Sequence, residues 1–366
     1  MKHLFLASEL YRGNGGIQVY SREFCRALSR TADVCVLSLN DEVVKTDEPF
    51  RFCGSGRVRF FRKYIFVVRA FLMAFFYKPD YIWCGHVHIS CLCRLMQRLT
   101  GIPFISILHG IESWEMSGCQ RKAVASSRRI ISVSVFTREK VLRQIPAYPL
   151  ERIDIIPGPV NPAIFKPRAR PAYLAKSLGI ESHHAVILTV SRLSAAERYK
   201  GYDRVIQALS AVRESIPDVR YIIVGSGDDQ ARLCGLIHEK GLDKNVILAG
   251  FVPSEMIPFY YNLCDCFAMP SSGEGLGIVF LEALASGKPV VAGNRDASSE
   301  ALLKGELGVL VNPDDSAQIA EAIIGLLKHT LDARFSDAQF LHDEVVKNFG
   351  IERFRERTVL CVKNLT

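Results

Sequence analysis

Several patterns that would point to a function class are missing from this chain of 366 residues. None of its eleven cysteines belongs to a C-x-x-C pair, so a zinc framework is not predicted. The apolar run Tyr64–Tyr77 contains Arg69 and is too short to span a bilayer. No zinc finger, basic zipper or ribonucleoprotein box is present, which argues against nucleic acid as a partner. The segment Met1–Ser8 is too short to predict a signal peptide.

The cysteines include two C-x-C pairs, Cys91/Cys93 and Cys264/Cys266, both in apolar surroundings. Residues two apart point to the same side of a strand. We therefore expect reduced core cysteines, as in a protein of the cytoplasm, and no disulfide framework.

Composition and charge give the first positive indications. With 49% apolar and 23% charged residues, the chain is typical of a globular α/β protein, and its length predicts two domains. Residues 1–165 hold 23 Lys and Arg against 13 Asp and Glu, whereas the remainder holds 23 against 25. A basic half predicts an anionic partner, and without a nucleic-acid signature we expect a membrane surface.

The most informative stretch runs from Pro270 to Ala292 and reads PSSGEGLGIVFLEALASGKPVVA. It follows the short apolar strand Cys266–Pro270 and continues through a glycine loop into helix-forming residues. Gly287 and Pro289 end that helix before the next strand. The pattern predicts a β–loop–α–β unit of a parallel sheet.

This unit contains two carboxylates and an expected anion site. Glu274 lies in the loop and Glu282 about two turns into the helix, roughly 10 Å away along its axis. That separation is too large for a close acid/base pair but suits two ends of one extended ligand. The backbone N–H groups of Gly275, Leu276 and Gly277 lie between them, at a helix N-terminus that favours anions. A sugar, a diphosphate and a ribose would suit the three positions.

The whole unit resembles the donor-binding signature of the family 4 glycosyltransferases, which are retaining enzymes of the GT-B fold. The resemblance implies that Glu274 holds the sugar and Glu282 the ribose, with Ile278 also at the donor. Gly15 and Gly16, in the loop GNGG, correspond to a family loop near the acceptor and the donor phosphate.

His109 ends a predicted strand in ILHGIE, where open α/β sheets present residues to ligands. The family has a histidine at the matching position, close to the transferred sugar. The other candidate histidines, His86 and His88 in GHVH, have no ligand cluster near them in the sequence. We expect them to be a polar strand end rather than a metal site.

Two cations follow the strand Ala185–Ser191. Arg192 and Lys200 would suit a diphosphate leaving group, because negative charge builds on it as the glycosidic bond breaks. The family has Arg and Lys-Gly here, although a longer spacing leaves Arg198 as a competitor for the role of Lys200. Gly225 and Gly227, after the next strand, fall where the family binds the nucleotide.

The expected architecture is therefore α/β and GT-B, with two Rossmann-like domains facing across a cleft. Residues 1–165 would bind the acceptor and residues 166–348 the nucleotide sugar, and the terminal helix in 349–366 would cross back to the first domain. No D-x-D occurs in the sequence, so we expect Arg192 and Lys200 rather than a metal to neutralise the diphosphate.

The resemblance implies a retaining hexosyltransferase, with a GDP- or UDP-sugar as donor and a glycan or polyprenyl-linked glycan as acceptor. We expect it in cell-surface polysaccharide or glycolipid assembly, at the inner face of the cell membrane. A nucleotide-sugar 2-epimerase of the same fold and a catalytically inactive, nucleotide-sugar-binding relative are the alternatives.

The basic and aromatic segment Arg57–Lys78 leaves two interpretations open. It could be a helix lying in the membrane interface, with charge from Arg57, Arg59, Arg62, Lys63 and Arg69. It could equally be a helix packed into the core beside a solvated strand edge.

Overall fold

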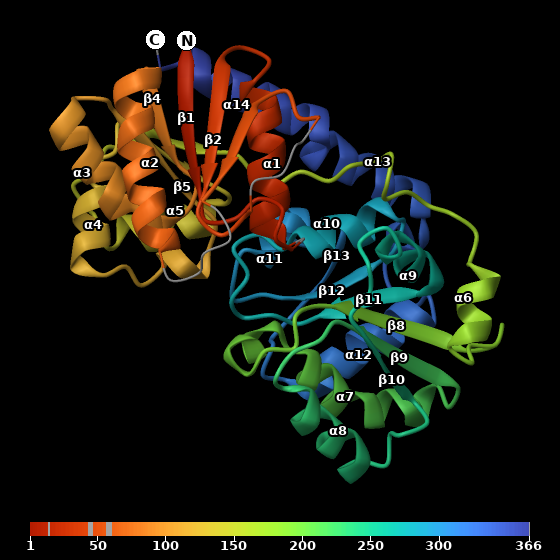
Figure 1. The fold of residues 1–366 in the computed structure, drawn as a ribbon. Helices are drawn as coiled ribbons and strands as arrows, with labels where there is room; N and C mark the ends of the chain where they lie inside the picture. Colours follow the sequence, from red (N-terminus) through yellow and green to blue (C-terminus); the bar gives the residue numbers. More distant parts are fainter. Residues whose placement is uncertain (14, 43–46, 56–60, 366) are drawn as a thin grey trace. The chain divides into compact units, whose positions relative to one another are not determined.

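The computed structural model describes residues 1–13, 15–42, 47–55 and 61–365 (Figure 1). The chain divides into two compact units. Unit 1 comprises Met1–Pro159 and Ile351–Thr366, and unit 2 comprises Val160–Gly350. Each contains one parallel β-sheet with helices packed on it, which confirms the expected α/β class with two Rossmann-like parts.

The sheet of unit 1 has seven parallel strands in the order β3-β2-β1-β4-β5-β6-β7. Their bounds are β1 Lys2–Ala7, β2 Asp33–Ser38, β3 Arg51–Gly54, β4 Tyr81–Cys84, β5 Phe104–Leu108, β6 Arg129–Ser132 and β7 Ile153–Ile155. The helices are α1 Gly16–Leu28, α2 Arg62–Tyr77, α3 Ser90–Thr100, α4 Gly118–Val124, α5 Val135–Leu142 and α14 Ile351–Lys363, with short 3₁₀ turns at Val87–Ile89, Ile111–Ser113 and Leu150–Arg152.

The sheet of unit 2 has six parallel strands in the order β10-β9-β8-β11-β12-β13. Their bounds are β8 Ala185–Val190, β9 Val219–Val224, β10 Val246–Gly250, β11 Cys266–Met269, β12 Val290–Gly293 and β13 Gly308–Val311. The helices are α6 Ala172–Ser177, α7 Tyr202–Ser215, α8 Gln230–Glu239, α9 Ile257–Leu263, α10 Ile278–Ala285, α11 Ser298–Ala301, α12 Ser316–Leu327 and α13 Ala338–Phe349, with 3₁₀ turns at Ala195–Lys200, Leu303–Gly305 and Ala333–Ser336.

In each sheet the first three strands are added in one direction and the later strands in the other. The order therefore reverses between β1 and β4 in unit 1 and between β8 and β11 in unit 2. In unit 2, Phe267 of β11 pairs with Leu188 of β8. Open parallel sheets bind ligands at such a reversal, outside the carboxyl ends of the strands. The loops that follow β8 and β11 are therefore the first place to look for a site.

The final helix, α14, packs beside α1 in unit 1 (Figure 1). The ring of Phe354 lies edge-on to Tyr20, with ring centroids 5.1 Å apart, and also contacts Phe24. All three side chains are buried. The last residues of the chain thus complete the core of the unit that the first residues begin.

One cysteine expectation is wrong. Cys91 of helix α3 is not a reduced core cysteine but forms a disulfide with Cys119 of α4, with 6.2 Å between their Cα atoms. The partners are far apart in the sequence, so a search for closely spaced cysteines could not find the pair. Cys264 and Cys266 are free and buried, as expected.

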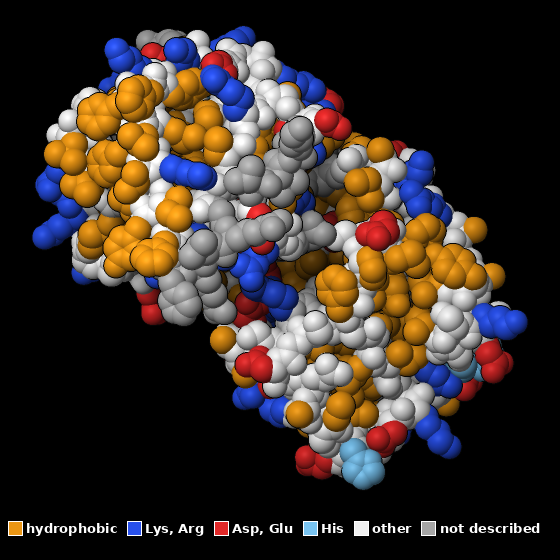
Figure 2. Space-filling model, in the orientation of Figure 1, with side chains coloured by type: hydrophobic (Ala, Val, Ile, Leu, Met, Phe, Trp, Pro, Cys, Tyr) orange, Lys and Arg blue, Asp and Glu red, His pale blue; other side chains and the backbone are white. Residues whose placement is uncertain are grey.

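Helix α2 has features of both interpretations of the segment Arg57–Lys78. Phe66, Ala70 and Ala74 recur every four residues and are buried in the core of unit 1. The outer side of the helix exposes apolar side chains, which gather over this part of the surface in Figure 2. Arg57 and Arg59 lie outside the described residues. No helix among the described residues is long and apolar enough to cross a membrane.

Candidate functional site

The site in unit 2 is built at the strand reversal between β8 and β11. The β–loop–α–β unit predicted from the sequence is present as β11, the loop 270–277, α10 and β12. The loop after β8 carries Arg192 and Lys200, and the loop after β11 carries Glu274. Because β8 and β11 are neighbours, residues far apart in the sequence come together here.

Lys200 and Glu274 form the central contact of the site. The Lys200 Nζ atom donates to Glu274 Oε1 at 2.6 Å, and the two side chains are only 16% and 14% exposed. Burial alone would lower the pKa of Lys200, but the charge of Glu274 outweighs it and leaves that pKa above its usual value. Lys200 is therefore a fixed cation. The ring of Tyr199 lies beside it, with its centroid 5.4 Å from Nζ.

The two arginines of the same loop have different partners. Arg192 lies on the surface with a side chain that is 77% exposed, and its guanidinium contacts Glu197 at 2.5 Å. Arg198 instead donates to Asp229, a fully buried carboxylate that also accepts from Arg232. These donors, with burial opposing them, hold the pKa of Asp229 well below its usual range. Arg198 is thus paired with Asp229 and does not compete with Lys200 for Glu274.

The backbone of Glu274 is clamped from the loop after β12. Its N–H group donates to Asp296 Oδ2 at 2.6 Å, and its carbonyl accepts from the N–H of Ala297 at 3.2 Å. Asp296 is 2% exposed, and its Oδ1 accepts from Ser298 N. Burial raises the pKa of Asp296 to about 6. This buried carboxylate fixes the position from which the Glu274 side chain extends.

Two glycines allow the loops to approach each other. A Cβ atom on Gly201, which has a φ of +78°, would lie 2.4 Å from the Pro270 carbonyl oxygen. A Cβ on Gly273 would lie 2.5 Å from the ring of Tyr199. The loop that carries Lys200 therefore packs directly on the loop that carries Glu274, and side chains at these positions would separate them.

The expected anion site begins where α10 begins. Gly277 caps the helix with a φ of +86°, and Ile278 is the first helical residue. Among the described residues, the N–H groups of Gly275, Leu276 and Gly277 donate to no protein acceptor. Leu276 is buried. These N–H groups are available for an anionic ligand, as a helix N-terminus is well suited to bind one.

Glu282 lies farther along α10, partly buried against α9. Its Oε2 atom accepts from the Tyr261 hydroxyl at 2.9 Å. Burial raises the pKa of Glu282 to about 7, so this carboxyl changes charge near neutral pH. Glu274, in contrast, is held beside a permanent cation. The two glutamates thus differ in partner as well as in position.

Gly225 and Gly227 have a structural reason to be glycine. A Cβ atom on Gly225 would lie 1.7 Å from the Ser191 carbonyl oxygen, and one on Gly227 would lie 2.0 Å from that of Leu193. The loop after β9 thus rests directly on the backbone on either side of Arg192. Both glycines shape the site, and direct contact of either with a nucleotide stays a prediction.

In unit 1 the predicted residues also follow strands near the reversal beside β1. Gly15 is the N-cap of α1 and Gly16 its first residue, while Asn14 lies outside the described residues. His109 follows β5 and is 8% exposed. Its ring lies edge-on to Tyr20, one turn after Gly16, with centroids 5.0 Å apart.

The protonation state of His109 is set by its surroundings. Its Nε2 atom lies 3.0 Å from the carbonyl oxygen of Gly85, which can only accept, so the proton is on Nε2. Burial lowers the pKa of His109 to about 4, despite the opposing effect of that carbonyl. The ring is therefore neutral at neutral pH and keeps a lone pair on Nδ1. His86 and His88 follow β4, as expected of a polar strand end.

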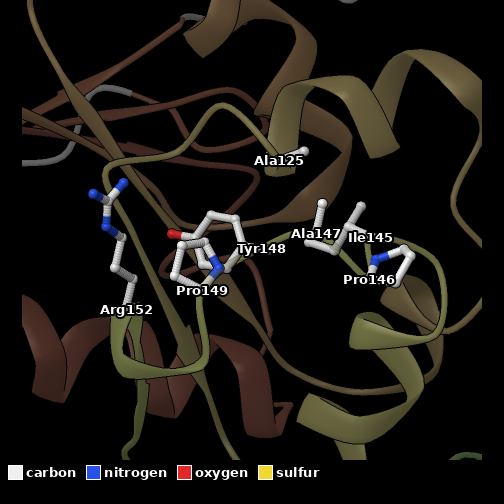
Figure 3. A pocket seen from close by; sticks show the side chains of 7 residues that line it. All are labelled: Ala125, Ile145, Pro146, Ala147, Tyr148, Pro149 and Arg152. Atoms are coloured by element: carbon white, nitrogen blue, oxygen red, sulfur yellow. The ribbon is translucent and has the colours of Figure 1, made fainter.

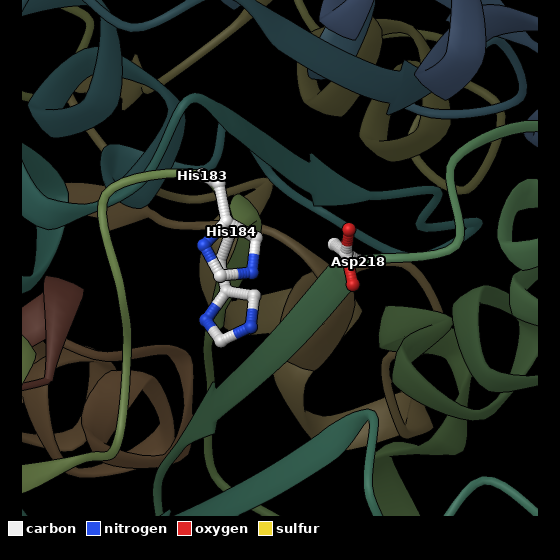
Figure 4. Close-up of side chains that lie close together, drawn as sticks. All are labelled: His183, His184 and Asp218. Atoms are coloured by element: carbon white, nitrogen blue, oxygen red, sulfur yellow. The ribbon is translucent and has the colours of Figure 1, made fainter.

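A surface pocket and a histidine cluster lie apart from the predicted residues. A pocket between α4, α5 and β7 is lined by Ala125, Ile145, Pro146, Ala147, Tyr148, Pro149 and Arg152 and contains none of the predicted residues (Figure 3). His183, His184 and Asp218 have ligand atoms within 4.8 Å of one another (Figure 4). The Arg220 guanidinium lies 2.8 Å from His184 Nε2, and Glu181 N donates to Nδ1. A cation and an N–H group thus occupy the coordinating directions of His184.

Comparison with known proteins places these residues in a family. The model of the glycosyl transferases group 1 matches residues 173–339, and the model of glycosyltransferase family 4 matches residues 14–164. The chain is 30% identical to the GDP-mannose-dependent alpha-(1-6)-phosphatidylinositol monomannoside mannosyltransferase of Mycolicibacterium smegmatis over 263 residues, which cover 67% of this chain and 66% of that protein. It is 31% identical to the D-inositol 3-phosphate glycosyltransferase of Acidothermus cellulolyticus over 272 residues, or 68% of this chain and 60% of the relative.

The chain belongs to the family 4 glycosyltransferases.

Solved structures agree on the fold of this family 4 chain. Anabaena Alr3699/HepE, in complex with UDP and glucose, matches with a TM-score of 0.82 and 21% identity over 100% of both chains. Sucrose-phosphate synthase from Thermosynechococcus elongatus matches with a TM-score of 0.84 and 20% identity, covering 100% of this chain and 99% of that one. At such identities the likeness concerns the fold.

Three residues of the site were not predicted: Tyr199, Tyr261 and Asp296. Asp296 closely follows β12, so examining the carboxyl end of every predicted parallel strand would have found it. Tyr261 lies within an apolar helix, where no sequence pattern distinguishes it from a core aromatic residue.

Proposed function

We propose that this family 4 glycosyltransferase transfers a hexose from a nucleotide diphosphate sugar to a hydroxyl group with retention of the anomeric configuration. The observation that carries the proposal is the Lys200–Glu274 pair at the strand reversal of unit 2. In the structure the two charges neutralise each other. With a donor bound, Lys200 would contact the diphosphate and Glu274 would contact sugar hydroxyls. These contacts would replace the ion pair between the two residues.

The leaving diphosphate gains negative charge in the transition state, and cations already in position stabilise it most effectively. Lys200 would supply one such charge. Arg192, whose side chain is long and exposed, would leave Glu197 and supply the second positive charge. In this proposal the two cations do the work that a divalent metal does in other sugar transferases. His109, neutral and with a free Nδ1 lone pair, would accept a hydrogen bond from a hydroxyl of the transferred sugar.

The N–H groups of Gly275, Leu276 and Gly277 would bind phosphate oxygens, and Glu282 would bind the ribose hydroxyls. For the donor we propose GDP-mannose or a UDP-hexose, which agrees with the donor in the name of the mycobacterial relative and with the UDP in the Anabaena complex. For the acceptor we propose a glycan or polyprenyl-linked glycan, used in polysaccharide or glycolipid assembly at the inner face of the cell membrane.

Arg192→Ala is the sharpest test, because the side chain is exposed and its loss should leave stability unchanged. Arg192→Ala and Lys200→Ala should each lower kcat by about 10²-fold or more, by analogy with the loss of one preorganised donor. Arg198→Ala is the matched control: it removes a neighbouring cation that binds Asp229, and kcat per folded molecule should stay near wild type. Equal effects of the three changes would contradict the assignment.

Incubation with nucleotide sugars and no acceptor distinguishes the alternative functions. A transferase hydrolyses its donor slowly, a 2-epimerase converts it rapidly, and an inactive relative leaves it unchanged. A panel of GDP- and UDP-sugars is first ranked by thermal shift, since at equal concentration the ligand with the higher affinity raises the melting temperature more. EDTA should leave activity unchanged, and strict dependence on Mg²⁺ or Mn²⁺ would contradict a reaction driven by the two cations.

A further inference from the structure

Helix α2 exposes an apolar surface that the fold of unit 1 does not use. Its buried side is fully occupied by the core. On the opposite side Tyr64 is 72% exposed, and the largest exposed fraction is the 83% of Phe76. The neighbouring helix α3 extends this surface with Leu95 and Leu99. We call the set the α2–α3 apolar face, and it consists of Phe61, Tyr64, Val68, Leu72, Phe75, Phe76, Leu95 and Leu99.

This surface differs from scattered exposed apolar residues. Positions 61, 64, 68, 72, 75 and 76 follow the three- and four-residue spacing of one side of a helix. Figure 2 shows hydrophobic side chains gathered over the part of unit 1 that carries α2. A groove within the face is lined by Phe61, Tyr64, Ile65, Val68, Arg69 and Leu72. Contiguous apolar surface of this kind marks an interaction site.

The two helices that form the face carry charges of one sign. Neither α2 nor α3 contains an Asp or Glu, while Lys63, Lys78, Arg94 and Arg98 lie on or beside them. In the part of the chain that the structure describes, none of these four cations forms an ion pair. Arg69, in the middle of α2, directs its guanidinium to the carbonyl oxygen of Gly54 at 2.5 Å, so only its aliphatic part lines the groove.

We propose that the α2–α3 apolar face docks on a lipid bilayer that contains anionic lipids. An apolar strip with a cationic border matches the acyl and headgroup layers of such a surface. A helix of 16 residues that cannot span a membrane would lie in the plane of the interface. A second copy of the chain is disfavoured as the occupant, because two such faces would bring cations against cations.

Docking itself does not depend on the proposed function. The purpose of docking does rest on the proposed function, because a bilayer on this face would hold unit 1 at the surface where a lipid-linked acceptor is found. Donor hydrolysis is therefore measured for every variant below, since it reports on the function and not on the docking.

The test is co-sedimentation of the full chain with neutral phosphatidylcholine vesicles and with vesicles that also contain phosphatidylglycerol. The triple variant V68Q/L72Q/F76Q removes apolar area without touching the core. Its control is I164Q/Y173Q/L360Q, which changes three apolar residues that are about half exposed and lie off the face. We expect the first triple to weaken partition into both kinds of vesicle by at least about tenfold, and the control to bind like wild type.

A second pair of variants separates charge from apolar contact. K63Q/R94Q/R98Q should weaken binding to anionic vesicles only, and the loss should be visible at about 0.1 M salt but not at about 1 M, where charges are screened. The control K176Q/K244Q/K304Q removes three exposed cations of unit 2 and should bind like wild type.

Three results would overturn the proposal. Wild type could bind neither kind of vesicle, or V68Q/L72Q/F76Q could bind both as wild type does. Wild type could also form a dimer in sedimentation velocity that the same triple abolishes, without binding vesicles; the occupant would then be a second copy. Unchanged donor hydrolysis in these cases would show that the docking failed and the function did not.

Discussion

Asp296 is the residue on which the position of Glu274 depends. Its two oxygens accept from the N–H groups of Glu274 and Ser298, and it is almost fully buried. In Asp296→Asn one of these N–H groups would face an amide NH₂ and lose its acceptor, which costs about 1–3 kcal/mol at a buried position. We expect kcat to fall by about tenfold or more as the Glu274 carboxylate shifts relative to Lys200.

The control for Asp296→Asn is Asp337→Asn. Asp337 also accepts from two backbone N–H groups, those of Gln339 and Phe340, but these belong to α13 and not to the loop that carries Glu274. Its substitution should lower the melting temperature and leave kcat per folded molecule unchanged. If Asp296→Asn behaves in the same way, Asp296 only stabilises the fold and does not position Glu274.

Glu282 gives a prediction about stability and pH. Burial raises its pKa from an ordinary 4.5 to about 7, so between these values the folded state binds more protons than the unfolded state. The free energy of unfolding contributed by this group therefore falls as the pH rises from about 4.5 to about 7. Glu282→Gln removes that slope. Relative to wild type, the variant should gain on the order of 1–3 kcal/mol between about pH 5 and about pH 8.

Urea unfolding of wild type and Glu282→Gln at the two pH values measures this difference. The same variant should weaken nucleotide binding, whereas Glu274→Gln should mainly lower turnover. The two carboxylates bind different ends of the proposed ligand, so the effects should be close to additive in the double variant. A constant stability difference across the pH range would show that Glu282 is ionised throughout.

At the scale of elements, the sequence predicted the parts whose cause is local. The strand that leads to His109 is present as β5, and the unit from β11 to β12 was found with its stop signals. Their apolar runs, glycines and prolines determine structure within a few residues. The two edge strands of the unit 1 sheet, β3 and β7, were not predicted. Each is four residues or shorter and is defined by its neighbour in the sheet rather than by its own pattern.

The candidate site divides in the same way. Lys200 and Glu274 were recognised separately from their motifs, but their ion pair follows from the adjacency of β8 and β11, a tertiary fact. The commitment of Arg198 to Asp229 also depends on a contact across the fold. The disulfide of Cys91 with Cys119 was missed because two helices bring the residues together. Side-chain pairing across the sheet is thus what motif reading could not supply.

At the scale of the whole molecule, the chain leaves unit 1 after Pro159 and returns to it at Ile351. The stability of unit 1 therefore depends on α14, the last helix in the sequence. Phe354 is the contact that joins α14 to α1, because its ring packs on Tyr20 and Phe24 and is 2% exposed. Tyr20 in turn contacts His109, so the same packing supports a predicted site residue.

Phe354→Ala should therefore destabilise unit 1 by about 3–5 kcal/mol, the usual cost of emptying a buried aromatic site. Hydrogen exchange should quicken in α1 and at the end of β5, while the strands of unit 2 keep their protection. Leu360→Ala is the control on the same helix, since Leu360 is 59% exposed and its loss should cost less than about 0.5 kcal/mol. Because Lys200, Glu274 and Glu282 all lie in unit 2, the thermal shift caused by a nucleotide should persist in Phe354→Ala. If exchange quickened equally in both units, the chain would unfold as one cooperative body, and the division at Pro159 and Ile351 would have no energetic counterpart.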